Sequence, residues 1–242
     1  MSYIFREHIK QSLAVIAFLI TLTACTSESY DAGDGPNSYL TADLVLLHTS
    51  QDKSVRSALL DDGTTLQFSN PFAQDWLTRP DSVYRALLYY DKTVAASDAA
   101  APNPTATSIV RARSVRPVPV LQPVEAEDME TLRTDPVGFE SLWLSKNKSY
   151  INLSLLLKSG KTEADDALHA LGIVSHGTTT DADRRRTLHL TLYHDQGGVP
   201  AYYTVQQYVS IPTQLLEEAD TVELTLNTYN GKKVMKVAVS NL

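Results

Sequence analysis

The sequence predicts an all-β protein: a five-stranded OB-type β-barrel followed by a seven-stranded antiparallel β-sandwich. Short runs rich in Val, Leu, Ile, Thr and Tyr recur along the chain after residue 40. Gly, Asp, Asn and Pro separate these runs, as they do between the strands of β proteins. A proline-rich stretch in the middle divides the runs into two blocks, which predicts two domains.

The N-terminal segment predicts export and attachment to lipid. Arg6 and Lys10 precede an apolar run over residues 12–22, which suits a secretory signal but is too short for a spanning helix of about 20 residues. Leu22-Thr23-Ala24-Cys25 resembles the lipobox of bacterial lipoproteins, in which the Cys is acylated and the chain is cut just before it. We therefore predict a lipoprotein signal peptide over residues 1–24 and lipidation of Cys25, the only cysteine. A secreted protein with an unmodified Cys25 is the alternative.

Composition limits the possible partners. The chain has a formal net charge of −7 at pH 7, which argues against binding to nucleic acid or electrostatic adhesion to anionic lipid. With Cys25 committed to lipid, no thiol remains for a disulfide, so packing of the 43% hydrophobic residues must hold the domains together. We expect membrane attachment through acyl chains on Cys25 and no nucleic-acid partner.

The first block predicts the barrel. Residues 25–38 are polar and glycine-rich, so we expect a flexible tether there. The OB-type barrel spans residues 39–117, with strands expected at 43–48, 55–60, 64–68, 82–90 and 109–116. Asp61-Asp62-Gly63 predicts a hairpin turn, because Gly adopts the positive φ that such turns need. Residues 70–81 and the low-complexity stretch 95–108 predict loops.

The second block predicts the sandwich. Pro117, Pro119 and Pro123 cannot donate to a strand ladder, so residues 118–136 are expected to form a linker. The sandwich spans residues 137–242, with strands expected at 138–144, 149–157, 167–175, 187–194, 202–209, 221–227 and 233–239. The third of these runs also fits a helical turn. Clean alternation over residues 187–194 and the Asn230-Gly231 turn favour a sandwich of short strands.

This layout resembles the NigD-like lipoproteins, which have a lipobox, an N-terminal OB-type barrel and a C-terminal β-sandwich. The matching features are residues 22–25, the hairpin over residues 59–66, and Asp135-Pro136-Val137 leading into the strand that holds Trp143. The family takes its name from an operon linked to bacteriocin production. The resemblance therefore implies an accessory or immunity role and no catalytic residues.

The sequence shows no signature of catalysis or of a metal site. There is no His-Glu-x-x-His, no Gly-x-Ser-x-Gly and no glycine-rich phosphate loop. His189 and His194 are five residues apart and thus on opposite faces of one regular strand. Paired carboxylates such as Asp165-Asp166 lie in turn-like stretches. We predict that the chain is not an enzyme and has no catalytic residues, no metal ligands and no cofactor.

Two sets of residues are candidates for a binding surface. Tyr202 and Tyr208 share one strand face by parity, and their rings either hold a ligand or pack the sandwich. OB-type domains bind through the face of strands 2 and 3 and the loops after strands 1 and 4. Arg56, Arg111 and Arg113 either add positive charge there or only discourage edge pairing.

These observations leave three functional hypotheses. The leading one is a non-catalytic outer-membrane lipoprotein, facing the periplasm or the cell surface, that binds an envelope protein in an accessory or immunity role. The second is a surface glycan-binding lipoprotein that uses Tyr202 and Tyr208. The third, a metal-assisted hydrolase, requires bound zinc after purification.

Replacement of Cys25 tests the anchor. We expect the full-length protein to fractionate with membranes and Cys25→Ala to leave them, because the acyl chains supply the attachment. Protease treatment of intact cells then shows which side the wild type faces. Co-fractionation of Cys25→Ala with membranes, as for the wild type, contradicts the lipobox interpretation.

Overall fold

The computed structural model describes residues 40–91, 108–161, 168–216 and 219–239. Residues 40–242 cluster as one compact unit. The predicted signal segment, Cys25, the tether and most of the 95–108 loop lie outside the described residues, so these remain predictions. Across the described ranges the regular structure is β apart from two 3-10 turns, η2 (Ala126–Asp128) and η3 (Thr213–Leu215). No helix in these ranges is long and apolar enough to cross a membrane.

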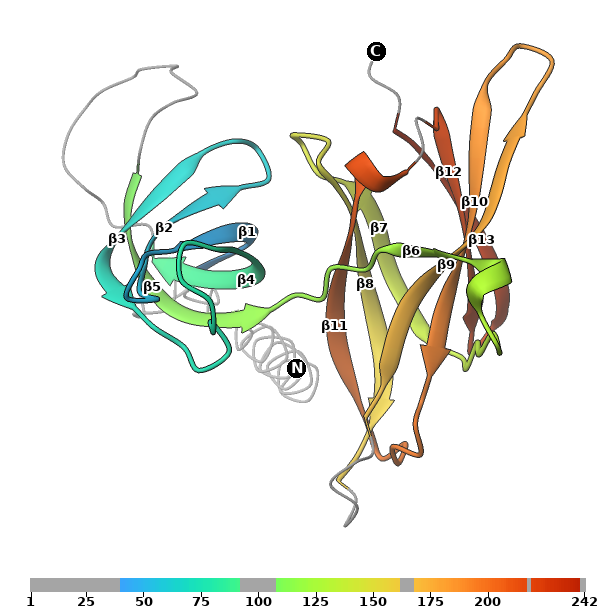
Figure 1. Cartoon of the computed structure of the whole chain (residues 1–242). Helices are drawn as coiled ribbons and strands as arrows, with labels where there is room; N and C mark the ends of the chain where they lie inside the picture. The colour runs from blue at the N-terminus through green and yellow to red at the C-terminus, as the bar shows by residue number, and fades with distance from the viewer. Residues whose placement is uncertain (1–39, 92–107, 162–167, 217–218, 240–242) are drawn as a thin grey trace, which may run out of the picture. The chain divides into compact units, whose positions relative to one another are not determined.

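The first five strands form the predicted closed barrel (Figure 1). They are β1 (Leu40–Thr49), β2 (Val55–Leu60), β3 (Thr65–Phe72), β4 (Val83–Asp91) and β5 (Ser108–Pro117). The order around the barrel is β1-β2-β3-β5-β4, with β1 pairing β4 to close it. All these pairs are antiparallel except β3 with β5. Gly63 has φ +88° in the turn between β2 and β3, as the sequence predicts.

The barrel core forms from alternate residues of these strands. Val45 and Leu47 of β1 and Ala86 and Leu88 of β4 are buried in one cluster. Leu77, from the predicted loop at residues 70–81, is buried in the same cluster and packs against the barrel interior.

The remaining strands form the predicted sandwich, with eight strands in place of seven. They are β6 (Pro123–Glu125), β7 (Gly138–Leu144), β8 (Tyr150–Ser159), β9 (Ala170–Thr180), β10 (Arg186–Asp195), β11 (Tyr203–Pro212), β12 (Thr221–Thr228) and β13 (Gly231–Ala238). One sheet has the order β13-β12-β10-β9-β6 and the other β11-β8-β7. Leucine, isoleucine and valine side chains from both sheets form the core between them. Within the ambiguous run, residues 170–175 belong to strand β9.

The sandwich is not purely antiparallel, which corrects that part of the prediction. β10 pairs with β12 in parallel, and so does β6 with β9. Turn signals show where neighbouring strands reverse, but β10 and β12 are separated along the chain by β11, which belongs to the other sheet. The sequence gives no local signal for such a crossover pair.

Residues 118–136 are paired with the sandwich, whereas the sequence predicts a linker. Pro123 begins the short edge strand β6, a position that tolerates a residue without an N–H donor. Val120 bridges Ser210, and Thr134 bridges His194. The prolines therefore mark the edge of the sandwich sheets rather than a free connection.

A pair of histidines lies beside this stretch. His194 is 1% exposed, and its Nδ1 lies 2.9 Å from the backbone oxygen of Asp135, which can only accept, so Nδ1 carries the proton. Nε2 of His194 then accepts from Nδ1 of His169 at 2.9 Å, and the two rings stack. Burial, with His194 adding to it, lowers the pKa of His169 below its ordinary value.

A buried arginine joins the barrel to the sandwich. Arg85 of β4 donates from Nη1 and Nη2 to the two carboxylate oxygens of Asp61, at 2.5 and 2.7 Å. Its Nε donates to Ser210 Oγ of β11 and its Nη2 to Asn152 Oδ1 of β8, both at 3.1 Å. The guanidinium also lies 4.3 Å from the centre of the Tyr150 ring. One side chain thus holds the hairpin turn of the barrel and two strands of the sandwich.

Apolar residues continue this junction. Leu44 of β1, Leu87 of β4 and Val118 form a buried cluster against Trp143 and Tyr208 of the sandwich. The side chains of β4 therefore alternate: Ala86, Leu88 and Tyr90 fill the barrel, and Arg85, Leu87 and Tyr89 face the β11-β8-β7 sheet. The two domains share a common boundary formed by side chains.

Removal of Arg85 tests how much this junction stabilises the fold. We expect Arg85→Ala to lower the free energy of unfolding in urea by about 3–5 kcal/mol, because the half-buried Asp61 loses its cation and the buried Asn152 and Ser210 lose their donor. Arg56→Ala is the matched control: its pair with Asp52 is exposed and 3.9 Å long, so about 0–1 kcal/mol is expected. Equal effects of the two variants contradict a stabilising role for the Arg85 network.

The lowered pKa of His169 predicts pH-dependent stability. Between that pKa and the ordinary value of 6.5, the unfolded chain binds more protons than the folded one. The free energy of unfolding should therefore fall as the pH is lowered through 6.5, and His169→Phe should remove part of that fall. Urea titrations between about pH 7.5 and pH 5 measure it. His48→Phe, at an exposed position of β1, controls for loss of an imidazole; the same pH slope in wild type and His169→Phe contradicts the prediction.

Candidate functional site

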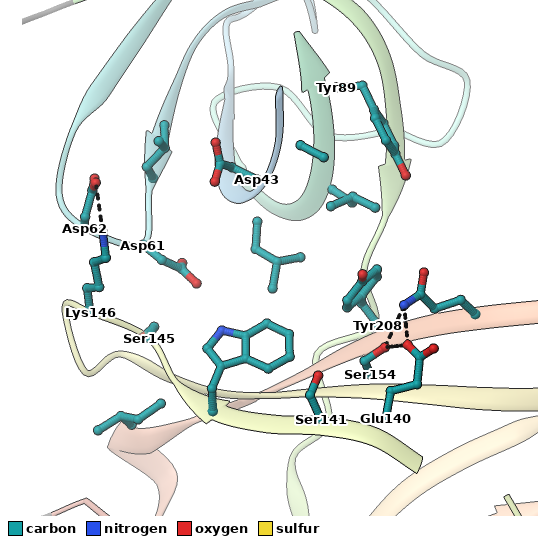
Figure 2. A pocket seen from close by; sticks show the side chains of 17 residues that line it. Asp43, Asp61, Asp62, Tyr89, Glu140, Ser141, Ser145, Lys146, Ser154 and Tyr208 are labelled. Carbon is teal, nitrogen blue, oxygen red and sulfur yellow. Dashed lines mark hydrogen bonds and ion pairs between the residues drawn. The ribbon is translucent and has the colours of Figure 1, made fainter. Parts of the chain in front are cut away.

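A cavity of about 400 Å³ lies at the junction of barrel and sandwich (Figure 2). Asp43 of β1 and Tyr89 of β4 line it from the barrel, together with the β2–β3 turn. Strands β7, β8 and β11 line it from the sandwich. Several of the side chains that join the two domains therefore border an open-sided space large enough for a ligand.

A β-bulge in β7 directs several side chains into this cavity. The pairing of β7 with β8 shifts register between Phe139 and Ser141. As a result Phe139 and Leu142 pack against the sandwich core, whereas Glu140, Ser141 and Trp143 line the cavity. Leu144 does both. Strict alternation would place Glu140 on the same face as Leu142. Bulges of this kind often re-aim side chains beside functional sites.

Aromatic rings form one wall. Trp143 and Tyr208 meet edge to face, with ring centres 6.3 Å apart and an interplanar angle of 82°. Leu44 and Leu87 pack with them. Tyr89, which also lines the cavity, accepts a hydrogen bond from Arg116 Nη2 at 3.0 Å. This wall offers apolar side chains and aromatic rings.

A polar cluster adjoins the aromatic wall. Oε2 of Glu140 accepts hydrogen bonds from Ser154 Oγ at 2.7 Å and from Gln206 Nε2 at 2.5 Å. Gln206 Nε2 also lies 2.9 Å from Ser154 Oγ. Figure 2 shows Glu140 and Ser154 joined in this way at the sandwich wall. The two donors fix the orientation of the Glu140 carboxylate without neutralising its charge.

The barrel wall carries the other carboxylates. Asp43 Oδ2 accepts from the hydroxyl of Tyr90 at 2.8 Å, and burial together with Asp43 raises the pKa of Tyr90, so this hydroxyl stays a donor. Asp62 accepts from the backbone N–H of Thr64, which lowers the pKa of its carboxyl, and lies 4.0 Å from Lys146. Asp61 is held by Arg85.

The cavity offers groups that can bind a ligand. Its described lining contains no histidine and no cysteine, so Ser154 has no imidazole base beside it. Within the described ranges, no group of three or more His, Cys, Asp or Glu side chains is placed to hold a metal. The described groups supply hydrogen bonds, negative charge and aromatic surface.

The structure separates the two tyrosines of the predicted binding surface. Tyr208 lines the cavity together with Gln206. Tyr202 precedes β11, is 78% exposed and is not among the residues that line the cavity. The pair therefore does not form one platform, and only Tyr208 belongs to this site.

The three predicted arginines lie elsewhere on the barrel. Arg56 of β2 pairs with Asp52, and Arg113 of β5 pairs with Asp91. Arg111 is exposed on β5. None of the three lines the cavity, so no positive charge from this set reaches it.

Sequence reasoning missed the residues that define the site. The sequence analysis named Trp143 only among the features that resemble the NigD-like proteins. No sequence pattern marked Glu140 or Asp43 as ligand-binding residues. A charged residue inside an otherwise apolar strand, such as Arg85, is the one signal that could have been used, since a buried guanidinium needs partners.

Comparisons with known proteins agree with this architecture. Residues 120–239 match the family model of the NigD-like C-terminal β-sandwich domain. Among curated proteins, none matches the sequence.

Several solved structures share the fold. A NigD-like immunity protein from Bacteroides caccae is 22% identical, with 81% of this chain and 91% of that chain aligned and a TM-score of 0.58. A candidate lipoprotein from Bacteroides fragilis is 15% identical, with coverage of 84% and 99% and a TM-score of 0.58. A candidate toxin-related protein from Parabacteroides distasonis is 19% identical, with coverage of 82% and 92% and a TM-score of 0.53.

The family match covers the sandwich, and the solved structures cover barrel and sandwich together. The predicted resemblance to the NigD-like proteins is confirmed, and residues 120–239 of this chain are a NigD-like C-terminal β-sandwich domain.

Proposed function

We propose that this chain is a non-catalytic binding protein of the bacterial outer membrane, anchored by lipid on Cys25, and that it holds a partner protein in the cavity between barrel and sandwich. The observation that carries the proposal is the cavity itself, which both domains line and which the Arg85 network supports. Its polar and aromatic groups are typical of a binding site.

The solved structures support the finer version of this proposal. One neighbour is a NigD-like immunity protein and another is a candidate toxin-related protein. An accessory or immunity role in bacteriocin production agrees with both descriptions. The candidate lipoprotein among the neighbours supports the lipid anchor.

A surface glycan-binding role is the second candidate. The Trp143–Tyr208 pair beside Gln206 and Glu140 favours it, because sugars bind to aromatic faces flanked by hydrogen-bonding groups. A glycan held in the cavity should be lost in Tyr208→Ala and retained in Tyr202→Ala.

Site-specific cross-linking tests the protein-binding proposal. We expect a photo-cross-linking amino acid at Ser141, an exposed cavity position, to yield one discrete heavier product in intact cells that express the full-length chain. Trp143→Ala in the same chain should abolish that product, because it removes the aromatic wall. The measurement is the mass shift of the tagged protein after illumination.

The matched control places the cross-linker at Gln51, in the exposed loop after β1 through which OB-type domains often bind. A discrete product from Gln51 alone moves the binding surface to that loop. The absence of any Trp143-dependent product from Ser141 contradicts the proposal.

A further inference from the structure

We propose that the exposed half of strand β11 pairs edge to edge with β11 of a second copy of this chain, about a two-fold axis at Val205. Neither the lipid anchor nor the ligand of the cavity enters into this pairing. Three observations carry it: unpaired backbone groups on β11, apolar side chains exposed beside them, and features on the other edges of the sandwich that discourage pairing.

The C-terminal half of the outer edge of β11 already has a partner within the chain. Ser210 donates its backbone N–H to the oxygen of Pro119 and accepts from the N–H of Leu121, both at 2.9 Å. Val120 bridges Ser210 in parallel, so residues 119–121 lie along this edge like a short added strand. The backbone groups of Ser210 therefore point away from β8.

The N-terminal half of the same edge has no such cover among the described residues. β11 pairs with β8 without a register shift, so residues two and four positions before Tyr208 and Ser210 keep the same orientation. The N–H and C=O groups of Thr204 and Gln206 therefore point outward, and no hydrogen bond from the described part of the chain reaches them. The free run ends at Tyr208, whose oxygen accepts from Gln207 Nε2 at 2.8 Å.

The other three edges of the sandwich carry features that discourage pairing with another chain. β13 has three lysines in eight residues. β7 contains the bulge described above, and β6 is only three residues long and begins with Pro123. Lysines, bulges, proline and short length are the usual means by which edge strands avoid other strands. Residues 203–206 of β11 have none of them.

Apolar side chains are exposed along the free run instead. Tyr203 is 49% exposed and Val205 36%, and Tyr202, just before the strand, is 78% exposed. An exposed edge strand with apolar side chains and unpaired backbone groups is a template for another strand. This half of β11 therefore has the properties of an interface.

An antiparallel pairing about Val205 satisfies all four free backbone groups of each copy. It places Thr204 of one copy opposite Gln206 of the other, and each such pair exchanges two N–H···O bonds. Val205 then faces its own counterpart in a non-hydrogen-bonded pair, in which side chains approach most closely. Tyr203 lies diagonally across from Val205 of the second copy, a favourable aromatic and β-branched contact.

The distribution of charge favours a second copy as the occupant. The chain carries a net charge of −7, so two copies repel each other at most orientations. Residues 196–216, which include the whole of β11, contain no charged side chain. Two copies can therefore pair along β11 without placing charged residues of these segments opposite each other, and the three-stranded sheets join into one continuous sheet with the two-fold symmetry typical of dimers.

A single cysteine at the axis tests this pairing in cells that express the full-length chain. We expect Val205→Cys to form a disulfide-linked dimer on mild oxidation. The Cα atoms of a non-hydrogen-bonded antiparallel pair lie about 4.5 Å apart, within the range of about 4.4–6.8 Å that disulfides span. The measurement is the fraction of tagged protein at twice the monomer mass on a non-reducing gel, with the wild type, whose one cysteine is Cys25, as the background.

Thr204→Cys and Val234→Cys are the matched controls. In the proposed register Thr204 lies diagonally across from its counterpart, about 7–8 Å away, which exceeds the reach of a disulfide. Val234 is 48% exposed but lies on the lysine-bearing edge strand β13. Each control should give at most about a tenth of the dimer that Val205→Cys gives.

A proline at position 204 tests whether the backbone hydrogen bonds hold the dimer. Thr204→Pro removes an N–H that points away from β8, so the ladder between β11 and β8 is retained. Each dimer loses two of its four backbone bonds, and the product from Val205→Cys should fall by about tenfold or more. An unchanged urea midpoint shows that the variant is folded. Tyr203→Lys, which places a charge at an exposed edge position, should lower the product in the same way.

Absence of a dimer from Val205→Cys overturns the inference, as does an equal yield from Thr204→Cys or Val234→Cys. A full yield from Val205→Cys in chains that also carry Thr204→Pro or Tyr203→Lys overturns it as well. A disulfide-linked product with a mass other than twice that of the chain identifies a different protein at this edge and rejects the second copy. Ser141 lies on β7, at the opposite edge of the same sheet, so the test of the cavity is decided separately.

Discussion

The ion pair between Arg85 and Asp61 is the interaction on which the junction of the two domains depends. A guanidinium taken out of water loses its hydration, and only close, well-directed partners compensate for that loss. Here the carboxylate of Asp61, the hydroxyl of Ser210, the amide oxygen of Asn152 and the ring of Tyr150 surround it. Three of these four partners belong to the sandwich, so the buried charge of the barrel is satisfied only when both domains are in contact.

That requirement changes which surfaces remain open. OB-type domains often bind through the face of their second and third strands. In this chain the turn between those strands is occupied: Asp61 holds Arg85, its backbone oxygen accepts from the N–H of Asn147 at 2.7 Å, and Asp62 lies near Lys146. The sandwich therefore occupies the turn between these strands, and the open space lies beside the junction.

The sequence predicts most of the strands because each depends on local pattern. The alternation of β10, the Asp-Gly turn at Gly63 and the apolar run of β1 are readable without tertiary context. The runs of β1 and β4 even show that both faces are buried, since Leu44 and Val45, or Leu87 and Leu88, are neighbours. Which residues cover the second face depends on contacts between parts of the chain that are far apart in the sequence. For the same reason the pairing of β6, the parallel β10–β12 pair and the partners of Arg85 had no signal in the sequence.

The site was harder to predict because it depends on an irregularity. Parity along a regular strand places Glu140 with Leu142, in the core, and it groups Tyr202 with Tyr208 as one surface. The bulge in β7 turns Glu140 away from the core and toward the cavity. Tyr202 and Tyr208 do not form one surface, because only the middle and the C-terminal end of β11 contact the barrel. A one-residue bulge costs little in a short edge strand, and here it places a carboxylate and an indole in one cavity. Binding chemistry in this chain thus arises where a local departure from the β pattern coincides with the contact between two regular domains.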